Sequence, residues 1–155
     1  MQSLRRISGL LGTALTGALF SGFGSAHPQA NAAIGSIVVR IDGFRNERGI
    51  ARVTVFDQAT GFPDKVEHAL RRAASPIEGG RVEVRFDSLP HGVYAVATFH
   101  DENADEKFNK GLFGRPKEGY GVSNNVVHAR HAPTFEEAQF RLDGDLRTLE
   151  IHVHY

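Results

Sequence analysis

Oxygen-bearing side chains with a spacing of two residues are the most chemically suggestive part of the sequence. They are Asp101, Asn103, Asp105 and Asn109, with Lys107 completing the spacing. Ca²⁺ takes oxygen ligands, and a calcium loop supplies them from its first, third, fifth, seventh and ninth positions. Such loops usually carry glycine at the sixth position and glutamate at the twelfth, where this sequence has Glu106 and Leu112. The run therefore predicts an incomplete calcium site, which Glu118 or a carbonyl could complete.

The same run has a second interpretation that needs no metal. Asp and Asn side chains often accept hydrogen bonds from nearby backbone N–H groups in turns that follow a strand. Because two defining residues of a calcium loop are missing, this Asx-rich turn is the favoured interpretation. Calcium is kept as the one candidate cofactor.

Residues on either side of this run are candidates for a binding surface: His100, Glu118, Tyr120, Ser123 and Asn124. An aromatic ring beside hydroxyl and amide groups can bind a glycan, a peptide edge or another protein, but the same groups can equally pin the loop internally. His100, Asp101 and Glu118 could act as acid and base in a hydrolase, with Ser123 as nucleophile. No spacing supports this, and Ser123 lies in no nucleophile elbow, so we predict no catalytic residues.

Two histidines near the end of the sequence suggest a transition-metal site. Glu150, His152 and His154 share one face of a predicted strand, because alternate residues of a strand point to the same side. Zinc or copper could bind there. The outward face of a terminal strand needs polar residues in any case, so a plain polar surface is favoured.

Alternation of apolar and polar residues predicts the strands that position these groups. They are expected at 36–42, 50–57, 81–87, 93–100, 138–142 and 149–155. The turn-forming segment 43–49 predicts a hairpin between the first two strands, and the turn at 143–145 joins the last two. The strand at 93–100 is apolar on both faces, as in a central strand, and we expect Tyr94 and Phe99 in the core.

The rest of the sequence predicts one helix and one long loop. Residues 63–73 favour a short helix, because proline opens the segment and apolar residues recur at helical spacing, at Val66, Ala69, Leu70 and Ala73. Residues 100–133 lack strand alternation but carry anchoring aromatic residues, so we expect an ordered loop. The predicted fold is an all-β, antiparallel β-sandwich with one short helix and a long ordered loop.

Composition excludes several classes of protein. The 155 residues suit one domain, and 18 lysines and arginines balance 18 aspartates and glutamates. Without a basic excess, binding to nucleic acid lacks its main driving force. The sequence has no cysteine, which excludes disulfides and cysteine-ligated zinc.

Residues 1–32 have the pattern of a cleaved signal peptide. Arg5 and Arg6 precede an uncharged apolar run, and small residues suit signal peptidase at positions ending in Ala26 or Ala32, of which we favour the second. The run is too short and too rich in glycine for a permanent membrane anchor. The pattern predicts a single domain at 33–155, periplasmic or secreted, with no membrane span after cleavage.

Two blocks of the sequence resemble a known bacterial family. The first is 89–96 (LPHGVYAV) leading into 100–105 (HDENAD), and the second is 114–125 (GRPKEGYGVSNN) followed by 133–138 (PTFEEA). They resemble the bacterial domain of unknown function 2141, a family of uncharacterised exported proteins. The resemblance covers residues 37–155 and implies an immunoglobulin-like or prealbumin-like sandwich, but no activity. Glu106 and His91 depart from the family pattern, and Glu106 weakens a tight calcium-type turn.

These observations predict an exported, non-enzymatic binding or interaction module of the cell envelope. Its expected partner is another envelope protein or a glycan, not nucleic acid. A calcium-stabilised structural domain is the first alternative, and a metal-dependent hydrolase is the second.

Overall fold

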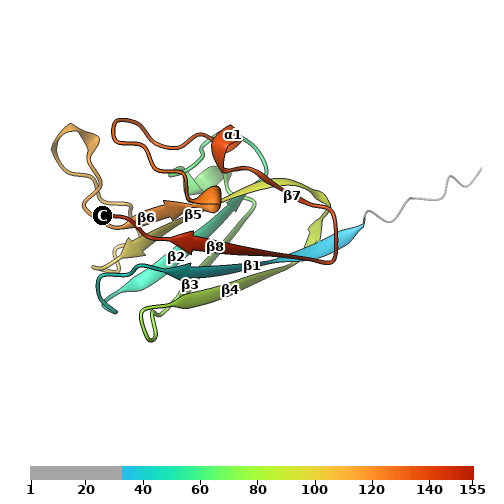
Figure 1. Ribbon diagram of the computed structural model, residues 1–155. Coiled ribbons are helices and arrows are strands. Elements are labelled where there is room, and N and C mark those ends of the chain that lie inside the picture. The colour runs from blue at the N-terminus through green and yellow to red at the C-terminus, as the bar shows by residue number, and fades with distance from the viewer. Residues whose placement is uncertain (1–32) are drawn as a thin grey trace, which may run out of the picture. The chain divides into compact units, whose positions relative to one another are not determined.

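The computed structural model describes residues 33–155, which form two β-sheets that share one core (Figure 1). The predicted signal peptide at 1–32 lies outside the described residues. The strands are β1 (Ile34–Asp42), β2 (Ile50–Phe56), β3 (Arg71–Ser75), β4 (Val82–Pro90), β5 (Gly92–Asp101), β6 (Tyr120–Val122), β7 (Phe140–Leu142) and β8 (Leu146–His152). The described chain is therefore all-β in class, as predicted.

The smaller sheet has the order β4-β1-β8. β1 pairs with β4 in the antiparallel sense but with β8 in the parallel sense, with Val39 opposite Leu149 and Ile41 opposite Ile151. The prediction of a purely antiparallel sandwich was wrong at this pair. Alternation shows which face of a strand is buried, but it carries no information on the direction of its neighbour.

The larger sheet has the order β3-β2-β5-β6, and β7 also pairs with β5. β5 is central, as its two apolar faces predicted. The hairpin predicted from the first two strands is wrong, because β1 and β2 belong to different sheets. β7 and β8, on either side of the predicted turn at 143–145, also belong to different sheets. Segments 43–49 and 143–145 therefore carry the chain from one sheet to the other.

Two apolar clusters hold these elements in place. The main core lies between the sheets and includes Ile37 and Val39 from β1, Val53 from β2 and Val96 from β5. A second cluster, which includes Phe56, Ala97 and Val122, covers the opposite face of the larger sheet. We call that face the outer face.

The predicted helix at 63–73 was wrong. The segment forms a single 3₁₀ turn at Val66–His68 and then β3, which pairs along the edge of β2 from Arg71 opposite Val55 to Ser75 opposite Ala51. The free N–H and C=O groups along that edge gain partners from a strand, which outweighs the helical spacing of a few apolar residues.

The one α-helix of the described residues is α1 (Phe135–Ala138). It begins with a capping box, in which the Thr134 side chain accepts from Glu137 N and the Glu137 carboxylate accepts from Thr134 N. No helix within residues 33–155 has the length and apolar character needed to cross a membrane.

Candidate functional site

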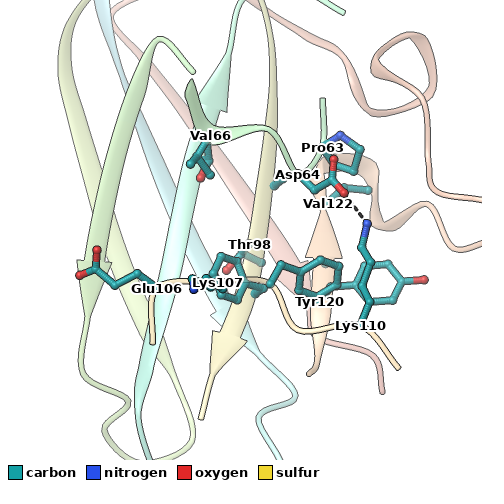
Figure 2. A pocket seen from close by; sticks show the side chains of 14 residues that line it. Pro63, Asp64, Val66, Thr98, Glu106, Lys107, Lys110, Tyr120 and Val122 are labelled. Atoms are coloured by element: carbon teal, nitrogen blue, oxygen red, sulfur yellow. Dashed lines mark hydrogen bonds and ion pairs between the residues drawn. The ribbon is translucent and has the colours of Figure 1, made fainter. Parts of the chain in front are cut away.

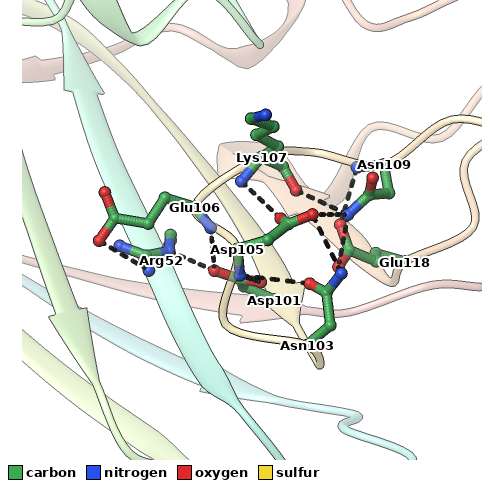
Figure 3. A network of polar contacts seen from close by, with 8 residues as sticks. All are labelled: Arg52, Asp101, Asn103, Asp105, Glu106, Lys107, Asn109 and Glu118. Atoms are coloured by element: carbon green, nitrogen blue, oxygen red, sulfur yellow. Dashed lines mark hydrogen bonds and ion pairs between the residues drawn. The ribbon is translucent and has the colours of Figure 1, made fainter.

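The end of β5 leads into a polar turn organised around Asp101, whose side chain is fully buried. Arg52 Nε on β2 donates to Asp101 Oδ2 at 2.6 Å, and the backbone N–H groups of Asp105 and Glu106 donate to the same carboxylate at 3.0 Å (Figure 3). The carboxylate therefore ties the loop to the outer face of the larger sheet.

Asp105 continues this network. Its carboxylate accepts from Lys107 N at 2.9 Å, and from the amide groups of Asn109 and Asn103 at 3.0 Å (Figure 3). The hydrogen bonds from Asn109 and Lys107 N lower the pKa of the Asp105 carboxyl. Glu106 adopts φ = 67°, the left-handed region in which calcium loops usually place glycine. The turn therefore forms without that glycine.

Glu118 reaches the same place from the far end of the loop. Its side chain is buried and accepts from Asn109 N at 2.8 Å. One oxygen each of Asp101, Asp105 and Glu118 lies within 4.8 Å of the others. An oxygen-only set of this kind suits Ca²⁺ or Mg²⁺. Leu112, at the position where a calcium loop carries its glutamate, is 80% exposed.

Asn109 stands between these oxygens. Its Nδ2 donates to Asp105 Oδ2 and lies 3.3 Å from the carbonyl oxygen of Lys107 and 3.5 Å from Glu118 Oε1. The network thus satisfies its own polar groups, as an Asx-rich turn does. A half-turn of the amide group would instead present the Asn109 oxygen to a cation. Both interpretations of the sequence are compatible with this geometry.

Two of the predicted binding residues are completely buried. His100 Nε2 lies 2.6 Å from the carbonyl oxygen of Arg48, and its Nδ1 lies 2.6 Å from the Tyr155 hydroxyl. Because a carbonyl only accepts, Nε2 carries the proton and Nδ1 accepts from the tyrosine. Ser123 Oγ donates to Ala138 O at 2.6 Å and accepts from Val96 N at 2.9 Å. Both side chains therefore join distant parts of the fold.

Asn124 uses its amide group in a similar way. Its Nδ2 donates to the carbonyl oxygens of Glu137 and Gln139, at 3.0 Å each. Asn124 adopts φ = 64°, a conformation that asparagine tolerates well. The side chain thus holds the end of β6 against α1.

Tyr120, the remaining predicted binding residue, lines a cavity of about 390 Å³ on the outer face of the larger sheet (Figure 2). Its floor is formed by side chains of β2, β5 and β6. The rings of Phe99, Phe108 and Tyr120 form one wall, with centroids 5.5 Å apart for the first pair and 6.1 Å for the second. Val66 lies across from them. We call this cavity the aromatic pocket.

The prediction that Phe99 lies in the core was wrong. Its ring is only half-buried and lines the aromatic pocket, whereas Tyr94 is buried between the sheets as predicted. The two residues lie on opposite faces of β5, and the outer face is only partly covered. Phe108 was not among the predicted site residues, although an aromatic residue within a polar loop was the signal that could have identified it.

The C-terminal histidines are not part of a three-residue metal site within residues 33–155. His152 Nδ1 lies 2.7 Å from Asp42 Oδ1, and the rings of His152 and His154 are 5.0 Å apart. Glu150 instead accepts from Arg40 at 3.4 Å.

The chain matches a known protein family. The family described as "Uncharacterized protein conserved in bacteria (DUF2141)" matches residues 39–150. Neither the curated proteins nor the solved structures compared with the chain gave a match.

Proposed function

We infer that this chain, which belongs to the DUF2141 family of proteins conserved in bacteria, is an exported, non-enzymatic binding module of the cell envelope. Its ligand would enter the aromatic pocket. The observation that carries this proposal is the pocket itself. A concave site of this size with a mainly apolar lining surface and some polar groups is typical of small-molecule sites.

The neighbouring contacts support a preformed pocket. Phe108 comes from the loop between β5 and β6, and the Asp101 network fixes both ends of that loop. Within the pocket lining, Lys110 forms an ion pair with Asp64 (Figure 2). Rigid positioning of this kind lowers the entropy cost of binding.

Two features favour binding over catalysis. The Ser123 hydroxyl is engaged by two backbone groups, which leaves it without a histidine partner. Among the described residues, no histidine or serine lines the aromatic pocket. A hydrolase would need a nucleophile or an activated water beside an acid or base.

Binding can be tested with N-phenylnaphthylamine, a neutral dye that fluoresces in apolar sites. We expect saturable binding to the wild-type protein, and loss of binding in Val66→Phe, which fills the pocket. Ile34→Phe adds the same ring at an exposed position outside the pocket and should bind the dye normally. Equal binding by both variants, or no saturable binding by wild type, would refute the proposal.

Export is supported by the charged, apolar and small residues that follow one another within 1–32. The mass of the protein from the periplasm or the medium should correspond to a chain that begins at Ala33 or, by the alternative cleavage, at His27. Full-length protein confined to the cytoplasm would contradict export.

A calcium-stabilised domain is the second candidate, and the convergence of Asp101, Asp105 and Glu118 favours it. A cation that binds only the folded state raises the melting temperature by mass action. We expect Ca²⁺ added after EDTA to raise the melting temperature of wild type and of Glu136→Gln, an exposed control on α1, but not of Glu118→Gln. An unchanged wild-type melting temperature would leave the Asx-rich turn as the complete explanation.

We also infer that the two sheets form an immunoglobulin-like or prealbumin-like sandwich. Their shared core and the short cross-sheet connections support this assignment. An experimental structure of the chain would test it, and a sheet order other than β4-β1-β8 would exclude it.

A further inference from the structure

A second cavity of about 180 Å³ adjoins the aromatic pocket. The two cavities share lining residues at their boundary, namely Phe108, Tyr120, Lys110, Asp64 and Pro63. The second cavity is otherwise lined by segments 114–116 and 128–133. We call it the arginine cavity, because Arg115 and Arg130 lie in these two segments.

The arginine cavity has an excess of positive charge. Asp64 is the one carboxylate among its described lining residues, and Lys110 already pairs with it. Arg115 and Arg130 are exposed and form no ion pair within residues 33–155. His128 Nε2 lies 2.8 Å from Glu137 Oε1, so this ring already contacts a carboxylate.

Neither guanidinium group pairs with a carboxylate of the described chain, so the two arginines add two positive charges to this cavity. Arginine binds carboxylate, sulfate and phosphate groups through paired N–H donors. An anionic group is the ligand chemistry that complements this cavity.

The aromatic pocket has the opposite character. Its exposed lining surface is mainly apolar, with three aromatic rings beside Val66, Ala97 and Val122. The charged side chains in its lining balance in sign: Lys107 and Lys110 against Asp64 and Glu106. An apolar ring or chain is the ligand body that complements these aromatic and aliphatic side chains.

Taking the proposed binding function as its basis, we propose that the ligand is an amphipathic anion. Its apolar body lies in the aromatic pocket, and its carboxylate, sulfate or phosphate group lies in the arginine cavity. Lys110, at the boundary, contacts both regions, since its Nζ lies 5.6 Å from the centroid of the Phe108 ring.

Two dyes with the same ring system separate this proposal from the proposed function. Anilinonaphthalenesulfonate carries a sulfonate group, and N-phenylnaphthylamine does not. We expect wild type to bind the anionic dye about tenfold more tightly, because two charge-assisted contacts are added. Rising salt should weaken binding of the anionic dye only.

Variants then show whether the preference for the anionic dye arises in the arginine cavity. Arg115→Gln combined with Arg130→Gln should remove the preference for the anionic dye and leave binding of the neutral dye unchanged. Arg141→Gln combined with Arg147→Gln removes the same charge from exposed positions outside both cavities and should leave the preference intact. Equal loss in the two double variants would overturn the proposal, because nonspecific charge would then explain it.

Competition identifies the natural ligand class more closely. Decanoate and naphthoate, which differ in having a chain or a ring, are compared with decanol and naphthol as displacers of the anionic dye. Displacement by a carboxylate but by neither alcohol supports an amphipathic anion and shows whether its body is a chain or a ring. Equal displacement by the alcohols overturns this inference but leaves the binding function intact. Failure of Val66→Phe to reduce binding of either dye overturns the binding function itself.

Discussion

Replacement of Ser123 by alanine tests the assignment of a structural role to that residue. β5 changes its pairing partner along one edge: residues from Ala97 to Phe99 pair with β6, and residues from Gly92 to Tyr94 pair with β7. Val96 N lies between these two stretches and donates to Ser123 Oγ at 2.9 Å. The same hydroxyl donates to Ala138 O, at the end of α1.

The magnitude follows from the two backbone groups that would lose their partner. Both lie against a side chain with no exposed surface, and a buried polar group without a hydrogen bond costs about 1–3 kcal/mol. Ser123→Ala should therefore reduce the free energy of unfolding by about 2–4 kcal/mol, since partial relaxation limits the sum. This loss is a large part of the free energy of unfolding of a typical domain, which is about 5–15 kcal/mol.

The assay is urea-induced unfolding followed by circular dichroism, with the slope of free energy against urea checked for constancy. Ser75→Ala is the matched control, because the Ser75 hydroxyl contacts only the neighbouring carbonyl of Pro76. A loss below about 0.5 kcal/mol in Ser123→Ala, the range of ordinary surface substitutions, would refute the proposed role.

Further predictions concern the core and the polar turn. Thr98 Oγ1 is buried and has no hydrogen-bond partner among the described residues. Thr98→Val should therefore raise the free energy of unfolding by about 1 kcal/mol in urea titrations. A decrease would show that the hydroxyl has a hydrogen-bond partner. Phe56→Ala should cost about 3–5 kcal/mol and Phe99→Ala clearly less, because Phe56 is fully buried and Phe99 is not; equal losses in the same assay would contradict the pocket assignment. The Asp105 carboxylate, whose folded pKa is lowered by its hydrogen bonds from Asn109 and Lys107 N, stabilises the fold above its unfolded pKa and loses this contribution as pH falls through the folded pKa. Urea midpoints measured from pH 7 down to about pH 3 should therefore decline less steeply in Asp105→Asn than in wild type, and parallel declines would show that the carboxylate contributes nothing.

Much of the fold could be predicted from alternation, because burial of one face imposes a period of two on a strand. Alternation correctly predicted the strands β1, β2, β4 and β5. Alternation did not predict β3, because Arg71 and Arg72 begin an edge strand with no clear apolar face. Alternation also could not predict which strands pair, because pairs such as the parallel β1–β8 pair join residues far apart in the sequence.

The candidate site was predicted unevenly. The local spacing of Asp101, Asn103 and Asp105 was enough to predict a polar turn, because its hydrogen bonds join residues only a few positions apart. Glu118 reaches the polar turn only because the whole loop folds back toward Asp101. The sequence therefore predicted Glu118 only as one of two possible ligands that could complete the calcium site, the other being a carbonyl oxygen. The aromatic pocket needed the outer face of three strands together with Phe108, which no linear pattern encodes.

The position of β1 between β4 and β8 has a consequence for folding. β8 is the last of the described strands in the sequence, so one edge of β1 has no partner until β8 joins the sheet. An unpaired strand edge with an apolar sequence invites association with other chains. Arg40, which in the finished sheet bonds Glu83 of β4 on one side and Glu150 of β8 on the other, places a charge in the middle of this exposed edge. The same side chain therefore discourages aggregation of the partly folded chain before it helps to align the three strands.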